Sequence, residues 1–255
     1  MAGPAGPLTE RDRYFFDLHG YVVRRGVLHR NEVEALTTAV DLLHLADPGT
    51  DIRSQRFTGH LTSARCFRDL IDHPCVFDVM LELCGEYLRL DHAYGIVMNP
   101  GNRGLGLHGG GTPHDPAQYY DVRNGRMYNG LVAAQWALVD HREGDGGFGC
   151  IPGSHRANFS FPVPTPQDWI TEVTLDAGDV VVFTEALTHC TLPWNALVPR
   201  RTLLYKYAPG PLSWGTNYQS DLRELTISGT LTERQRVLMD PPSVSPRTSL
   251  RGFGG

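Results

Sequence analysis

The sequence predicts a mainly β protein with a double-sheet core and a layer of helices before it. Two observations lead to this fold class. After residue 88, six short segments rich in β-branched and aromatic residues follow one another, separated by Gly, Pro, Asn and Asp. Before that point, apolar residues recur at helical spacing. Strands without helices between them favour two packed sheets over a doubly wound α/β fold.

The helical layer is expected over residues 9–88 and contains three helices and one strand. Thr9 is a suitable N-cap for the first helix, and Asn31 for the second. The strand covers residues 20–28, and the third helix covers residues 76–88. The layer therefore begins with a helix and a strand and ends with a helix that leads into the β core.

The β core is expected over residues 89–210 and a covering segment over residues 211–255, all in a single domain. The predicted strands are LDHAYGIVMNP, NGLVAAQWALVD, FGCIPGS, WITEVTL, GDVVVFTEA and RTLLYKYAP. A GDGG turn precedes the third of them. In the covering segment, Thr232 and Gln235 have the spacing of a capping box and predict one more helix.

Composition and charge limit the possible partners. A hydrophobic content of 41% and a charged content of 20% are ordinary for a soluble enzyme. The net charge of −5 creates no field that attracts nucleic acid or an anionic membrane. The five cysteines have no pairing pattern, so we expect free thiols in a reducing cytoplasm. A cytoplasmic enzyme acting on a free small molecule, without a membrane, nucleic-acid or carrier-protein partner, is the expectation.

Three residues stand at predicted strand ends, where a jelly roll can bring them together. His189 ends the segment GDVVVFTEALTH, Arg200 begins the next strand, and His108 follows GLGL. Two neutral imidazoles and one carboxylate on one face hold Fe(II) and leave three positions open. In oxygenases that use this triad, 2-oxoglutarate fills two of those positions, and an arginine fork pairs with its far carboxylate.

The segments GDGGFGCIPGSHRANF, GDVVVFTEALTHC and RRTLLYKYAPG, with FFDLHGYVVRRGVL before them, resemble phytanoyl-CoA dioxygenase-like enzymes. These are Fe(II)- and 2-oxoglutarate-dependent oxygenases with a double-stranded β-helix core, a cupin-like jelly roll. The resemblance implies that His189 is an iron ligand and that Arg200 binds the far carboxylate of 2-oxoglutarate. Arg201 should point to the opposite face of its strand. Ser154 and His155 belong to the signature, and we expect both to be structural.

The chain departs from this family at the proximal motif H-x-D, where it has His108-Gly109-Gly110. In one interpretation Gly110 leaves a coordination position open for chloride, as in non-haem iron halogenases with H-x-G or H-x-A. In a second, a more distant carboxylate, most plausibly Asp115, folds back onto iron and the enzyme is a hydroxylase. His114 is then a rival to His108. In a third, the site is degenerate and the protein only binds a ligand.

The overall likeness extends to free-standing halogenases that chlorinate adenine nucleotides in nucleoside-antibiotic biosynthesis. It implies a catalytic set of His108, Gly110 and His189, with His108 and His189 as metal ligands, Arg200 for the cosubstrate, and Fe(II), 2-oxoglutarate, chloride and O2 as cofactors. No motif specifies the substrate. Candidate groups for an anion are the basic residues Arg53, Arg56, Arg65, Arg126 and Lys206, and candidate stacking residues are Tyr119 and Trp194.

Overall fold

The computed structural model describes residues 6–46, 54–215, 225–226 and 229–253, and two antiparallel sheets form its centre. The strands are β1 (Tyr21–Arg24), β2 (Gln55–Phe57), β3 (Arg89–Met98), β4 (Leu105–His108), β5 (Tyr120–Arg123), β6 (Arg126–Asn129), β7 (Val132–Ala137), β8 (Gly147–Cys150), β9 (Thr171–Glu172), β10 (Val180–Thr184), β11 (His189–Leu192) and β12 (Arg200–Ala208). One sheet has the order β1-β10-β7-β12-β3-β2 and the other β4-β11-β8-β9, while β5 and β6 form a separate hairpin. The predicted fold class, mainly β with a jelly-roll core, is confirmed.

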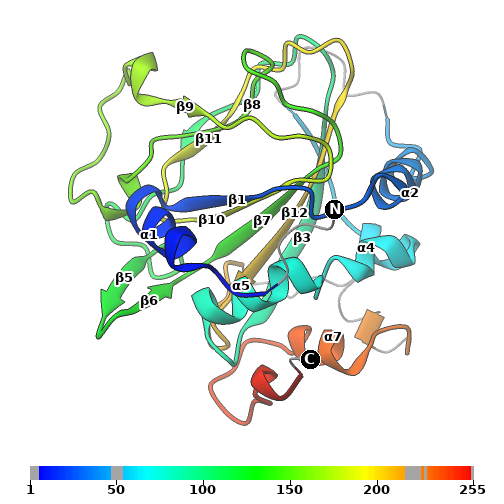
Figure 1. Ribbon diagram of the computed structural model, residues 1–255, viewed down its shortest axis with the longest axis vertical. Helices are drawn as coiled ribbons and strands as arrows, with labels where there is room; N and C mark the ends of the chain where they lie inside the picture. Colours follow the sequence, from blue (N-terminus) through cyan, green and yellow to red (C-terminus); the bar gives the residue numbers. More distant parts are fainter. Residues whose placement is uncertain (1–5, 47–53, 216–224, 227–228, 254–255) are drawn as a thin grey trace.

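Helices cover the outer face of the six-stranded sheet. The described helices are α1 (Glu10–His19), α2 (Arg30–Asp41), α3 (His60–Ser63), α4 (Arg65–Asp69), α5 (Pro74–Cys84) and α7 (Glu233–Leu238). Short 3-10 turns also occur, at η1 (Ser154–Arg156), η2 (Gln167–Trp169) and η3 (Leu250–Phe253). Figure 1 shows α4, α5 and α7 on one side of this sheet and β8, β9 and β11 on the other. The four-stranded sheet thus closes the inner side, where the site lies.

Both faces of β7 are buried, which explains why all its residues except Gln135 are apolar. Val132, Ala134 and Trp136 belong to the hydrophobic cluster that the helices share. Ala133 and Ala137 alternate with them and belong to a second cluster, together with residues of β8 and β10. The six-stranded sheet is therefore sandwiched between the helices and the second sheet.

The described part of the N-terminal layer has five helices where three were expected, and it differs from the expectation in further details. Thr9 caps α1 in a capping box, as predicted. The second helix begins earlier than predicted, because the backbone of His29 is extended and its N–H donates to Glu32. Asn31 therefore lies inside α2 and is not its cap. In addition, the layer supplies two sheet strands, β1 and β2, at the edges of the six-stranded sheet.

The segment predicted as one strand ending at His189 is two strands in different sheets. β10 ends at Thr184, and the N–H of Leu187 donates to the Thr184 carbonyl in a tight turn. His189 then begins β11 in the four-stranded sheet. The prediction was wrong here because an apolar run does not reveal where a chain leaves one sheet for another.

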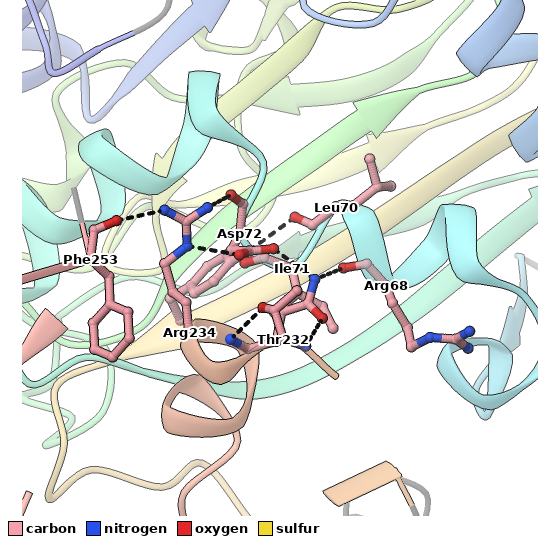
Figure 2. A network of polar contacts seen from close by, with 9 residues as sticks. Arg68, Leu70, Ile71, Asp72, Thr232, Arg234 and Phe253 are labelled. Carbon is pink, nitrogen blue, oxygen red and sulfur yellow. Dashed lines mark hydrogen bonds and ion pairs between the residues drawn. The ribbon is translucent and has the colours of Figure 1, made fainter. Parts of the chain in front are cut away.

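The C-terminal segment is attached to the helices by a buried polar network centred on Asp72 (Figure 2). Its carboxylate accepts hydrogen bonds from Arg234 Nε at 2.7 Å and from Gln235 Nε2 at 2.8 Å. Arg234 also donates to the carbonyl of Phe253 at 3.0 Å. The capping box of Thr232 and Gln235 is present, as predicted. The segment therefore covers α4 and α5 through specific contacts.

In the part of the chain that the structure describes, no helix is long and apolar enough to cross a membrane. All five cysteines lie in that part and are free thiols, as expected.

We predict that His60 makes the protein sensitive to acid. Its side chain is fully buried among Phe57, Phe67 and Tyr205, and burial lowers its pKa to about 4. The folded state therefore disfavours the protonated ring, and stability is lost as the pH falls from about 6.5 towards 4. His60→Phe should remove up to about 3 kcal/mol of that loss, as urea unfolding at pH 7 and pH 4 would measure.

The exposed His114 offers the matched control. His114→Gln should unfold with the pH dependence of the unmodified protein. An equal acid sensitivity of the His60→Phe variant and the unmodified protein would show that His60 does not contribute.

Candidate functional site

Two histidines face each other across the pair of antiparallel strands β4 and β11. His108 is the register partner of His189, and the centroids of the two rings are 4.3 Å apart. In each ring Nδ1 lies at hydrogen-bond distance from a backbone carbonyl two residues earlier, at 2.9 Å for Gly106 and 2.7 Å for Leu187. An Nδ1–H that donates to a carbonyl leaves the Nε2 lone pair free for a metal.

His189 is held in the form that binds metals. Its side chain is buried, and burial lowers its pKa to about 4, although the Glu185 carboxylate opposes this. The imidazole is therefore neutral near pH 7, and a metal ion does not have to displace a proton from Nε2.

The glycine run after His108 passes close to the turn between β10 and β11. Gly110 donates its N–H to the carbonyl of Glu185 at 3.1 Å, and both Gly109 and Gly110 have positive φ. A Cβ at Gly109 would lie 2.9 Å from two ring atoms of His189. A Cβ at Gly110 would lie 3.0 Å from Thr188 Oγ1. The backbone is therefore shaped for glycine at both positions, and no side chain enters the site from this run.

The carboxylate of Asp115 is engaged in its own turn. It accepts hydrogen bonds from the backbone N–H of Ala117 at 2.7 Å and of Gln118 at 3.2 Å, and from Gln118 Nε2 at 3.0 Å. Among the described residues, no three His, Cys, Asp or Glu side chains are grouped so that they could hold a metal. Neither Asp115 nor another carboxylate thus completes a three-residue set with His108 and His189.

An ion pair that the sequence analysis did not find lies beside the histidines. Lys206 Nζ is 2.7 Å from Glu185 Oε1, and both side chains are at most one-tenth exposed. Burial by itself would raise the pKa of Glu185. The Lys206 ammonium, together with His189 and His108, has the larger effect and lowers the pKa to about 2. Burial by itself would lower the pKa of Lys206, but the Glu185 carboxylate outweighs this effect, so the pKa is raised. The pair stays charged on both sides.

This ion pair forms part of the wall of a cavity of about 470 Å³ that His108 also lines. The cavity is also lined by Trp214 and by Tyr94, whose ring centroid lies 3.5 Å from the Arg56 guanidinium. Arg56 forms no ion pair with any described residue. The cavity therefore combines aromatic surfaces with one uncompensated cation next to the histidine pair.

Two of the five basic residues proposed from the sequence, Arg56 and Lys206, thus line this cavity. Arg65 pairs with Asp69 on the surface, and Arg126 contacts Tyr128 of its own hairpin. Arg53 lies outside the described residues. Trp194 is fully buried, so it cannot stack on a ligand in this cavity.

Arg200 is buried at the start of β12 without a carboxylate partner among the described residues. Its side chain is 1% exposed, Nη1 contacts Met98 Sδ at 3.4 Å, and Nε has no hydrogen-bond partner. Burial lowers its pKa to about 10, so it remains a cation near pH 7. Arg201 points to the other face and pairs with Asp41 of α2 at 2.8 Å, which confirms the predicted opposite orientation. A buried, unpaired guanidinium is suited to an anionic ligand.

The PGSH segment supports the turn that precedes His189. Ser154 Oγ accepts the N–H of Thr188 at 2.8 Å. His155 Nε2 lies 3.1 Å from the carbonyl of Asp17, and its ring packs on Tyr120. These contacts agree with the structural roles expected for both residues.

The chain is similar to known proteins over most of its length. Residues 16–202 match the family model described as phytanoyl-CoA dioxygenase (PhyH). The structure of HygX from Streptomyces hygroscopicus with nickel, 2-oxoglutarate and hygromycin B bound is similar, with 27% identity and a TM-score of 0.74. The match covers 85% of this chain and 94% of HygX.

Two more distant structures share the fold. The 2-oxoglutarate-dependent carbocyclase SnoK from nogalamycin biosynthesis is 20% identical with a TM-score of 0.64, over 83% of this chain and 91% of SnoK. The epimerase SnoN, also from nogalamycin biosynthesis, is 22% identical with a TM-score of 0.62, and the match covers 79% of this chain and 83% of SnoN. No curated protein matches the chain.

We predict that Lys206 is needed to keep the Glu185 carboxylate stable in this wall. Lys206→Met leaves a buried charge without a partner and should lower the free energy of unfolding by about 3–5 kcal/mol. The double variant Glu185→Gln/Lys206→Met should lose less, because no charge remains. Urea unfolding at pH 7 measures both, and an equal loss in the two variants would contradict a strong interaction between the side chains.

Proposed function

Because the chain belongs to the phytanoyl-CoA dioxygenase (PhyH) family of Fe(II)- and 2-oxoglutarate-dependent oxygenases, we propose that it is a halogenase that chlorinates an unactivated C–H bond of a free small molecule. In this proposal His108 and His189 hold the iron, Arg200 binds the far carboxylate of 2-oxoglutarate, and chloride takes the position that Gly110 leaves open. The residues fit these groups, since both histidines have Nε2 free and the buried Arg200 lacks a carboxylate partner among the described residues.

The observation that carries the proposal is the missing carboxylate. The family motif H-x-D places an aspartate where this chain has Gly110, and Asp115 is bound within its own turn. Two neutral imidazoles supply no negative charge, so the site retains more positive charge than one with a carboxylate. That charge and the open position both favour a small exogenous anion.

The bound iron, with 2-oxoglutarate and O2, supplies the oxidising chemistry that acts on the substrate C–H bond. The chain's own residues orient the components. The carbonyls of Gly106 and Leu187 fix the rings of His108 and His189. Glu185 and Lys206 form an ion pair whose opposite charges cancel, so the neighbouring wall has a fixed polar surface without a net charge.

An adenine nucleotide is the substrate class we propose. The cavity beside His108 supports it, because the exposed Trp214 offers an aromatic surface for a planar base and Arg56 offers a cation for a phosphate. HygX has a small molecule, hygromycin B, bound in its solved structure. These features support a small polar substrate in antibiotic biosynthesis.

The alternative is hydroxylation by the same fold, with Asp115 as the carboxylate ligand. It requires Asp115 to give up three hydrogen bonds within its turn. Loss of iron binding on replacement of Asp115 would favour this alternative.

We predict that iron binding separates His108 from its rival His114. His108→Ala should abolish Fe(II) binding, because one of only two protein ligands is lost. His114→Ala should keep it, since this side chain is exposed in the loop after the glycine run. Anaerobic calorimetry with Fe(II), and the visible charge-transfer band after adding 2-oxoglutarate, measure the effect. Loss of iron in the His114 variant with retention in the His108 variant would refute the ligand assignment.

A protein that binds no 2-oxoglutarate at all would be a non-catalytic binder.

We predict that turnover with chloride yields a chlorinated product and that Gly110→Asp eliminates it. The assay contains Fe(II), 2-oxoglutarate, O2, chloride and AMP or dAMP, with detection by mass spectrometry. Gly110→Ala is the matched control, because it meets the same contact with Thr188 and the same positive φ without adding a carboxylate. It should retain part of the chlorination, and Asp115→Asn should leave it intact, because Asp115 is no ligand in this proposal. Hydroxylated product alone in saturating chloride, lost in Asp115→Asn, would establish the hydroxylase instead.

A further inference from the structure

His141 is a second buried group without a partner next to Arg200. Its side chain is 1% exposed, and neither ring nitrogen has a hydrogen-bond partner. Its position is held on both sides, because its backbone pairs with Leu175 through two hydrogen bonds and its ring packs on Trp194 at 5.2 Å. Turning the ring to a partner elsewhere would break its packing on Trp194.

His141 and Arg200 converge on Gly147, the first residue of β8. A Cβ at Gly147 would lie 3.1 Å from His141 Nδ1 and 3.4 Å from Arg200 Nε. The imidazole and the guanidinium therefore approach the same point from two elements of the fold. Gly147 has positive φ and no side chain to separate them.

The chemistry of the two groups specifies their ligand. Burial and the nearby Arg200 charge both lower the pKa of His141, so its ring is neutral and carries one N–H. Arg200 remains charged and has an unused Nε–H. Each buried donor without an acceptor is costly, so a ligand that accepts from both is stabilised. A carboxylate has two acceptor oxygens and the negative charge that the guanidinium needs.

We propose that His141 donates a hydrogen bond to the carboxylate that Arg200 binds, so that the two side chains form a two-donor clamp for the far carboxylate of 2-oxoglutarate. This inference rests on the proposed function for the identity of the ligand. His141 acts here as a positioning residue, and it gives the protein a means to prefer a five-carbon diacid over shorter oxoacids.

The test is equilibrium binding with two oxoacids. His141→Phe keeps the ring packing on Trp194 but removes the donor, and it should weaken 2-oxoglutarate binding tenfold to a hundredfold. The affinity for 2-oxobutyrate, which has no far carboxylate, should not change. His141→Gln restores a donor and should recover part of the affinity. Calorimetry on the anaerobic Fe(II) protein gives each dissociation constant without turnover.

The control is His60→Phe, which replaces another buried histidine with two unpartnered nitrogens in the helical layer. It should leave both affinities unchanged. Without 2-oxoglutarate, His141→Phe should melt no lower than the unmodified protein, because it removes a desolvated polar group. Adding 2-oxoglutarate should raise the melting temperature of this variant less than that of the unmodified protein.

Equal weakening of both oxoacids, or none, in a folded His141→Phe variant would overturn the clamp. Failure of the unmodified protein to bind 2-oxoglutarate would instead refute the proposed function, so the two failures are distinguishable.

Discussion

The turn between β10 and β11, residues 184–188, is the contact on which the site depends. It carries the chain from the six-stranded sheet to the four-stranded sheet. Its backbone hydrogen-bonds four other segments, at Gly20, Gly110, Leu131 and Ile151. Glu185 in this turn lies in the cavity wall and His189 follows the turn directly, so the positions of the carboxylate and the imidazole follow from where the two sheets join.

Close approach to this turn also explains why glycine follows His108. The loop lies near enough to donate from Gly110 to the Glu185 carbonyl, and a Cβ at either Gly109 or Gly110 would crowd the turn or the His189 ring. An aspartate at 110 therefore requires a different path of the backbone. The loss of the carboxylate and the shape of the loop are consequences of one packing arrangement.

Buried charge is distributed unevenly around the histidines. On one side Glu185 and Lys206 neutralise each other in the cavity wall. On the other, Arg200 has no carboxylate partner among the described residues, and His141 beside it is neutral. An unpaired buried cation is costly to a protein unless a ligand neutralises it. In the proposed function, the unpaired cation would face the anionic cosubstrate and the neutralised wall would face the substrate.

The amino-acid sequence was enough to predict the fold class, the helix caps at Thr9 and Thr232, and the opposite faces of Arg200 and Arg201. These follow from local rules of periodicity, capping and strand alternation, which involve neighbours along the chain. It also singled out His108 and His189, because of the motif around them. Only the tertiary structure showed that His189 starts a new strand, that Glu185 pairs with Lys206, and that His141 converges on Arg200. Those relations join residues from different strands and loops, and their distances depend on how the two sheets pack, which no local pattern encodes.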